Sequence, residues 1–131
     1  MTTPTPAHAA DWWVPEWPAP PGVHALCTTR SGGVSQPPYD SLNLGAHVGD
    51  DTAAVQANRL RLDAVVNAIT PDTRTVFLQQ VHGDGVVHLH PHTPSGTEAD
   101  ACLATDAGVA CTIMVADCLP VLYAHTGGAV V

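Results

Sequence analysis

Two short segments carry the residue types most able to do chemistry in this chain. The first is LQQVHG, residues 78–83, in which His82 follows an apolar run; the second is VADCLP, residues 115–120, in which Cys118 follows another. Imidazole and thiolate groups are zinc ligands, and a thiol beside an imidazole can act as a nucleophile. Because each segment lies just past a predicted strand, two buried backbones could aim both side chains at one point.

The residue types alone do not separate a metal site from a thiol site. A catalytic zinc ion usually has three protein ligands and one open position, so His82 and Cys118 by themselves would bind zinc poorly. A metal-free pair would instead support attack by the Cys118 thiolate, with the imidazole donating a proton to the leaving group. The ordinary alternatives are a turn histidine exposed to water and a buried, inert cysteine.

A second group of histidines, His88, His90 and His92, alternates along the sequence. On a strand these side chains would share one face, a geometry that can chelate nickel or copper. Pro91 indicates a sheet edge or a strand end, which favours a solvated polar edge instead. Copper oxidases need several histidines, and this one cluster gives that function little support.

The elements that must position these residues follow from apolar periodicity and turn residues. Residues 11–22 hold all three tryptophans among several prolines, which predicts an extended flank. Residues 23–29 predict a strand, and residues 30–50 a long loop. Asp50 or Asp51 can cap a helix that runs to about Ile69, before Pro71, because apolar residues recur there at near 3.6 spacing.

The remainder of the chain predicts short strands. Residues 75–81 and 85–90 form two strands around the turn at 83–85, and residues 99–103 form a weak one. Residues 109–116 are apolar on both faces, as in a central strand covered on each side. Residues 120–124 predict a further strand, and residues 129–131 the opening of another.

Composition excludes several classes of function. The chain has 131 residues and a formal net charge of −8, which disfavours binding to nucleic acid or to an anionic membrane. Its four cysteines contain no C-x-x-C pair, which excludes a zinc ribbon and fits a reduced, cytoplasmic protein. We expect no secretory signal and no membrane span.

Read together, the motifs resemble the YfiH-type laccase-domain family, known both as multicopper polyphenol oxidoreductases and as purine nucleoside phosphorylases. The resemblance rests on TTRSGGVSQPPYDSLNLGAHVGDD at 28–51, on Asn58 and Arg59, on QQVHG at 79–83, on EADA at 98–101 and on ADCLPVL at 116–122. It implies a catalytic zinc trio, of which His82 and Cys118 match two members. The third, a histidine in a later H-A-G-W-R-G motif, has no counterpart here, so the chain resembles the N-terminal half of a family member.

The resemblance also implies phosphorolysis of purine nucleosides (adenosine, inosine and methylthioadenosine) with inorganic phosphate, together with deamination of adenosine. A phosphate dianion suits an arginine fork, and the candidates are Arg30 in the glycine-rich loop and Arg59 on the helix. Backbone amides of SGGV, residues 31–34, are a further candidate, although a Gly-Gly pair is more often only a turn. We expect Arg61 and Arg74 to be solvated surface charges.

Four polar residues complete the predicted site. Asn43 and His47 lie in the long loop and are expected to line the substrate pocket, whereas Gln80 and Asp117 are expected to orient the metal ligands. For Asp117, a strand-end residue that hydrogen-bonds backbone amides is an equal alternative.

These observations predict an α+β fold with layered mixed sheets and one principal helix, of the cysteine hydrolase type, with its C-terminal part missing. Residues 1–22 would be a flexible flank, and residues 23–131 the N-terminal portion of one catalytic domain. The cofactor would be zinc, with copper as the alternative, and the protein a monomer or homodimer. A copper-dependent polyphenol oxidase and a metal-free cysteine hydrolase remain the competing functions.

Overall fold

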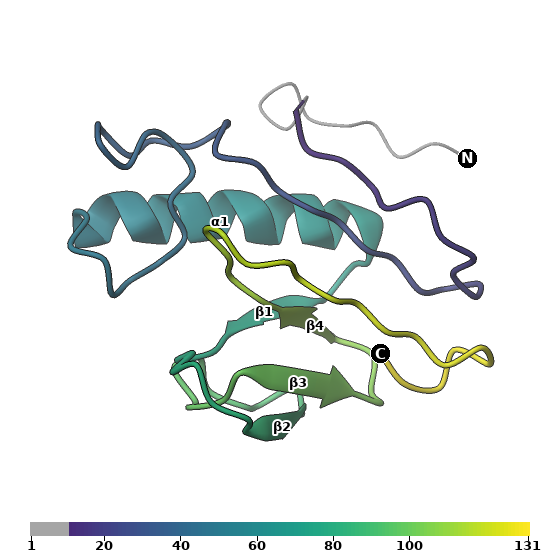
Figure 1. Cartoon of the computed structure of the whole chain (residues 1–131). Helices are drawn as coiled ribbons and strands as arrows, with labels where there is room; N and C mark the ends of the chain where they lie inside the picture. The colour runs from purple at the N-terminus through teal and green to yellow at the C-terminus, as the bar shows by residue number, and fades with distance from the viewer. Residues whose placement is uncertain (1–10) are drawn as a thin grey trace. The chain divides into compact units, whose positions relative to one another are not determined.

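The computed structural model describes residues 11–131, which form two compact units. The first unit contains residues 11–17 and 24–69, and the second contains residues 18–23 and 70–131. Among the described residues, the one helix belongs to the first unit and all strands belong to the second (Figure 1). The prediction of an α+β chain with one principal helix is confirmed. The part of the predicted flank at residues 1–10 lies outside the described residues.

Helix α1, Thr52–Ile69, begins where Asp51 caps it. The Asp51 carboxylate accepts a hydrogen bond from the backbone N–H of Ala53 at 3.4 Å, and its carbonyl accepts one from Val55 at 3.1 Å. The first of these bonds satisfies an amide that the first helical turn leaves without a partner, and the second is the first backbone hydrogen bond of the helix itself. The helix ends two residues before Pro71, as the sequence predicts.

One face of α1 is buried within the first unit. Its buried residues recur at intervals of three and four positions, which is the spacing of a single helical face: Val55, Asn58, Leu62 and Val65. The apolar spacing predicts Val55, Leu62 and Val65 on this face, whereas the polar Asn58 is not part of that pattern. Asn58 is in fact fully buried, at 0 % exposure, and is therefore a structural centre of the unit.

The loop at residues 30–50 lies alongside α1 (Figure 1) and folds back on itself. The backbone N–H groups of Ser41 and Leu42 both donate to the carbonyl of Arg30, at 2.9 and 2.8 Å. The prediction of a strand at residues 23–29 is wrong: that segment makes one isolated antiparallel bridge, between Trp13 and Cys27. An apolar run there extends along the unit without a continuous partner strand.

The second unit contains two short parallel sheets. In one, β1 (Arg74–Phe77) pairs with β4 (Val109–Thr112); in the other, β2 (Val86–Leu89) pairs with β3 (Ala101–Ala104). The mixed sheets that the sequence predicted are not seen among these strands. The turn at residues 83–85 also does not join its flanking strands into a hairpin, because β1 and β2 each pair elsewhere.

One apolar core joins both sheets of this unit. It is built from Val76, Leu78, Leu89, Ala99, Ala104 and Val109, with Val87, Cys102, Cys111, Ile113 and Val131 packed against it. Leu89 and Val76 are both 0 % exposed. Burial of such side chains stabilises by about 1.5–3 kcal/mol each, so this core fixes how the four strands lie together.

The C-terminal residues only partly follow the prediction. Residues 120–124 form no strand, and their apolar side chains are largely exposed, with Tyr123 at 78 %. Val131 does pair with Ala104 at the end of β3, through two reciprocal backbone hydrogen bonds of 2.9 and 3.1 Å. The predicted strand opening at residues 129–131 is not formed, because Val131 alone makes this pair of bonds. No helix in residues 11–131 has the length and hydropathy needed to cross a membrane.

Candidate functional site

The predicted site residues divide between the two units. Gln80, His82, Asp117 and Cys118 belong to the second unit, whereas Arg30, Asn43, His47 and Arg59 belong to the first. The predicted metal-binding group and the predicted substrate-binding group are therefore carried by separate parts of the chain. Each group has its own local architecture.

His82 lies in a turn that is held by one carboxylate. The backbone N–H groups of Val81, His82 and Gly83 donate to the Asp100 carboxylate at 2.9, 2.8 and 2.8 Å. His82 has a φ of 58°, the left-handed conformation that residues other than glycine rarely adopt. Consecutive amides in such a turn form an anion-binding concavity, and here Asp100 fills it.

Charge and hydrogen bonding keep Asp100 ionised. The backbone N–H of Gly83, and with it those of His82 and Val81, lowers the pKa of the Asp100 carboxyl, against an opposing effect of burial. Charge-assisted bonds of this kind are the stronger ones in proteins. The turn that carries His82 is therefore stabilised by a carboxylate over the whole neutral range.

A side-chain amide ties the His82 segment to the Cys118 segment. Gln80 donates from Nε2 to the carbonyl of Met114 at 2.9 Å and accepts from the Met114 N–H at 2.8 Å. β1 and β4 lie side by side as parallel strands, so the segments that follow them leave the sheet at the same edge (Figure 1). Carboxyl ends of parallel strands are common ligand sites.

Asp117 and Cys118 lie in the exposed stretch that follows β4. The imidazole of His82 is exposed as well. Imidazole and thiolate match the ligand chemistry of zinc, but within residues 11–131 no group of three or more His, Cys, Asp or Glu side chains is placed to hold a metal ion. The donor types fit a zinc site, while a full set of three protein ligands is not assembled in this part of the chain.

In the first unit, Asn58 organises the long loop. Its Oδ1 accepts from the N–H of Val34 at 2.8 Å, and its Nδ2 donates to Ser35 Oγ at 2.9 Å and to the carbonyls of Asn43 and Ser41 at 2.8 and 3.2 Å. All polar atoms of this buried amide are thereby used, which burial demands. The loop is consequently held at defined points along α1.

Asp50 extends this network. Its carboxylate accepts from the Ser35 hydroxyl at 2.6 Å and from Asn43 Nδ2 at 3.1 Å. The Ser35 hydrogen bond, followed by those of Asn43 and Asp51, lowers the pKa of the Asp50 carboxyl, against an opposing effect of burial. Asn43 is therefore engaged in holding the loop, whereas His47 is exposed on it.

The two candidate phosphate ligands differ in their surroundings. Arg30 has a side chain 74 % exposed, with an Nη2 to Asp40 Oδ1 distance of 3.6 Å and a hydrogen bond from Nε to the Asp40 carbonyl. Arg59 is half-buried and donates from Nε to the carbonyl of Leu44 at 2.9 Å. Burial lowers the pKa of the Arg59 guanidinium, which still stays protonated near neutral pH.

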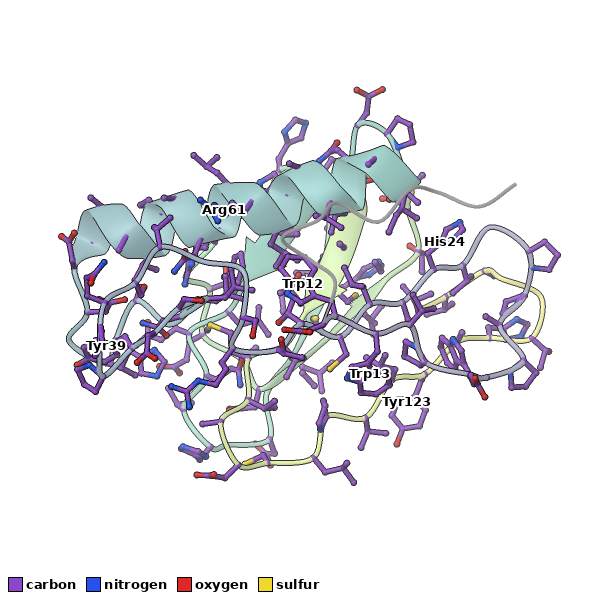
Figure 2. The ribbon with its side chains drawn as sticks, turned by 90° about the horizontal axis from the view of Figure 1, so that it is seen from above. Trp12, Trp13, His24, Tyr39, Arg61 and Tyr123 are labelled. Atoms are coloured by element: carbon purple, nitrogen blue, oxygen red, sulfur yellow. The ribbon has the colours of Figure 1, made fainter. Side chains whose placement is uncertain are left out.

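The prediction that Arg61 and Arg74 are solvated surface charges is wrong. Arg61 donates to the carbonyl of Gly32 at 2.8 Å, next to the Ser31 carbonyl that accepts from the indole of Trp12 at 2.9 Å (Figure 2). Arg74 donates from its guanidinium to the carbonyls of Pro91 and Thr93. Arg61 thus ties the long loop to helix α1, and Arg74 ties the loop after β2 to strand β1. The loop carbonyls that accept these bonds are placed by the folded backbone, so the composition of the chain does not reveal this role.

The alternating histidines lie at an exposed sheet edge, which is the placement that the sequence favours. The rings of His88 and His90 lie 4.4 Å apart, and His88 Nε2 is 3.0 Å from Thr105 Oγ1. His90 Nδ1 is 3.5 Å from Asp106 Oδ2. These contacts are with hydroxyl and carboxylate groups of a solvated sheet edge.

Two residues important to the site region were not assigned a role from the sequence. Asn58 carries a signal in hindsight, because it lies three positions after Val55 and four before Leu62, on the buried helical face. Asp100 lies in the EADA motif, but its partners are backbone amides, which leave no mark in the sequence.

The fold and these strand-end residues define a class of small α+β proteins with short parallel sheets. Residues 24–131 match the family model described as multi-copper polyphenol oxidoreductase laccase, and the chain belongs to this family. A crystal structure of Neisseria meningitidis protein NMB0706 has a TM-score of 0.83 and 41% identity, over 91% of this chain and 47% of that one.

Curated relatives carry a specific name. The purine nucleoside phosphorylase PA4543 of Pseudomonas aeruginosa is 52% identical over 117 residues, covering 89% of this chain and 46% of the relative. The purine nucleoside phosphorylase YfiH of Escherichia coli is 49% identical over 115 residues, covering 88% and 46%. The chain spans about half the length of the curated relatives it matches.

Proposed function

We propose that this chain is the N-terminal portion of a zinc-dependent purine nucleoside phosphorylase that also deaminates adenosine. The observation that carries the proposal is the β1 and β4 pair, which delivers the VHG and ADCLP segments from one sheet edge. The names of the relatives support the reaction. Residues 23–131 would form one portion of a single catalytic domain, in a cytoplasmic monomer or homodimer.

His82 and Cys118 are the proposed metal ligands and catalytic residues. The register supports their convergence: Arg74 lies opposite Val109, an offset of 35 positions, and the same offset carried past the strands would put His82 opposite Asp117. Gln80 holds the two segments at this spacing. A third ligand would come from a segment outside these 131 residues, and a bound zinc ion would supply an acidified water for deamination.

The first unit would serve the phosphate and the nucleoside. In phosphorolysis a phosphate oxygen bonds to C1′ of the ribose while the bond from C1′ to the purine nitrogen breaks, so the phosphate must be held as an anion near the sugar. Arg30 is the proposed direct phosphate ligand, because its guanidinium group is exposed to solvent next to Asp40. Arg59 would act with Asn43 and His47 in shaping the loop that receives the nucleoside.

A chimera tests this function. The chain would replace the matching segment of the Pseudomonas aeruginosa relative, and phosphate-dependent release of adenine from adenosine would be measured, with inosine formation as the deaminase assay. We expect activity that His82→Ala and Cys118→Ala each reduce by at least about 100-fold. His92→Ala, at an exposed site outside the two motifs, is the matched control. Full activity in both site variants would refute the proposed roles.

A copper-dependent polyphenol oxidase is the second candidate, favoured by the family description. It predicts stoichiometric copper with visible absorption in the purified chimera and oxidation of phenols. A colourless preparation that contains zinc and cleaves adenosine would exclude it.

A further inference from the structure

The carboxylate of Asp100 accepts more hydrogen bonds from the protein than an ordinary surface carboxylate does. Val81 and His82 donate to its Oδ1, and Gly83 donates to its Oδ2, so both oxygens are committed to one turn. A Cβ on Gly83 would lie 3.3 Å from Oδ2, which shows how closely the turn wraps the carboxylate.

The backbone of Asp100 is held by bonds that do not involve its side chain. Its own N–H and that of Ala101 both donate to the carbonyl of Gly85, at 3.0 and 3.1 Å. Two residues before it, Glu98 forms a parallel bridge with Gln79. Backbone bonds on both sides of residues 81–83, at Gln79 and at Gly85, therefore present the carboxylate to the three amides.

The conformation of His82 needs such a partner. A φ of 58° is unfavourable for a residue with a side chain, and three charge-assisted bonds offset that strain. If the carboxylate were removed, the three amides would lose their common acceptor and the turn could relax to ordinary negative φ values. The direction of the Cα to Cβ bond of His82 would then change.

We propose that Asp100 is the positioning residue of His82: by filling the ring of three amides it fixes the backbone from which the imidazole enters the site. The inference rests on the proposed function, since metal binding by His82 is itself a proposal. It adds a residue that contacts neither metal nor substrate but sets the geometry of one that does. Partners that hydrogen-bond the ring of a metal-binding histidine typically contribute about 10–100-fold to metal affinity, and a partner of its backbone should act at the lower end of that range.

The test uses Asp100→Ala and Asp100→Asn in the chimera with the Pseudomonas aeruginosa relative, because that protein also supplies the segment from which a third ligand would come. Zinc affinity is measured by competition with a chromophoric chelator, and amide hydrogen exchange is followed at residues 81–83. We expect Asp100→Ala to weaken zinc binding by at least about tenfold, to speed exchange at the three amides, and to be partly rescued by added formate. Asp100→Asn retains one acceptor but sets an N–H group against another, so it keeps the fold with a smaller loss.

Two controls make the outcomes separable. Asp84→Asn removes the same charge from the same turn and should change zinc affinity by less than about twofold. In a His82→Ala background, Asp100→Ala should have no further effect on zinc affinity, because Asp100 acts through His82.

Unchanged zinc affinity and unchanged exchange in both Asp100 variants would overturn the inference. If His82→Ala leaves zinc affinity untouched, the proposed metal site fails instead, and the exchange and formate rescue at residues 81–83 still decide whether Asp100 holds the turn.

Discussion

The side-chain amide of Gln80 pairs with the backbone of Met114 through two hydrogen bonds, of 2.9 and 2.8 Å, in the manner of a neighbouring strand. One residue thus joins the segment that leads to His82 with the segment that leads to Cys118. This link lies beyond the last paired residues of β1 and β4, Phe77 and Thr112. It continues the contact between the two segments where the backbone ladder has ended.

Replacing Gln80 by alanine should therefore loosen the site more than it unfolds the chain. Loss of both bonds leaves the Met114 groups without this partner and should cost about 1–3 kcal/mol of unfolding free energy. The measurement is urea denaturation together with amide exchange at Met114. Gln79→Ala, at the exposed neighbouring position, should cost less than half as much. Equal effects of the two substitutions would contradict the role given to Gln80.

Asn58→Leu should destabilise the first unit severely. Leucine fills a similar volume but leaves the Val34 amide, the Ser35 hydroxyl and the carbonyls of Ser41 and Asn43 without this partner. We expect a loss on the order of 3–5 kcal/mol. Chemical denaturation followed by tryptophan fluorescence measures it. Gln56→Leu, exposed on the same helix, is the control, and a comparable loss there would argue against a special role for Asn58.

Gly33→Ala should disrupt the same loop for a steric reason. A Cβ at this position would lie 2.5 Å from Leu42 Cα and 2.6 Å from Asn58 Oδ1, and closer still to the carbonyl oxygen of Ser41. Since two of these are backbone atoms, the loop itself must shift. The thermal midpoint should fall well below that of Gly85→Ala, whose Cβ would meet nothing nearer than 3.8 Å. Equal midpoints for the two variants would show that the loop accommodates a side chain at position 33.

The Asp50 network should make stability depend on acidity. Hydrogen bonding by Ser35 lowers the pKa of Asp50 below its ordinary value of 3.8 in the folded state. The stabilisation is thus fully present above 3.8 and is lost as the pH falls through the lower folded value. Denaturation at several pH values should show this acid loss in the wild type and a smaller one in Asp50→Asn. Asp11→Asn, an exposed carboxylate, should retain the wild-type profile.

Cys118 should be the first cysteine to react with iodoacetamide. Its side chain is exposed, whereas Cys27, Cys102 and Cys111 are half-buried. A hydrogen bond from Cys111 lowers the pKa of the Cys102 thiol, and the same contact raises the pKa of Cys111, so Cys102 should react before its neighbour. Peptide mass spectrometry after limited alkylation gives the order. Prior modification of Cys111 would show that these thiols are arranged differently in solution.

The sequence predicted what local chemistry controls. Helix α1 was predictable because its apolar spacing, the Asp51 cap and Pro71 all act within a few residues. The pairing of β1 with β4 was not, since the partner of Arg74 is Val109 and no turn residue encodes such a distance. The sequence predicted two strands around the turn at residues 83–85, but it did not reveal that each of them pairs with a strand elsewhere in the chain. Residues 120–124 are apolar, but they pair with no other segment within residues 11–131 and therefore form no strand.

The candidate site shows the same division. His82 and Cys118 were identifiable because imidazole and thiol groups are chemically distinctive and follow apolar runs. Asp100 was not, because its function depends on three amides that any residue could provide. Arg61 and Arg74 were misjudged since arginine on a polar surface and arginine bonded to a loop carbonyl look alike in a sequence. Side chains whose hydrogen-bond partners are backbone groups are therefore the ones whose roles a sequence pattern does not reveal.

The central claim, that His82 and Cys118 share one metal ion, is tested most directly by titrating the chimera with cobalt(II) as a spectroscopic substitute for zinc. We predict a sulfur-to-cobalt charge-transfer band that saturates at one ion per chain, disappears in Cys118→Ser, and weakens with lost affinity in His82→Ala. A band that is absent in the wild type, or that persists unchanged in either variant, would contradict the account.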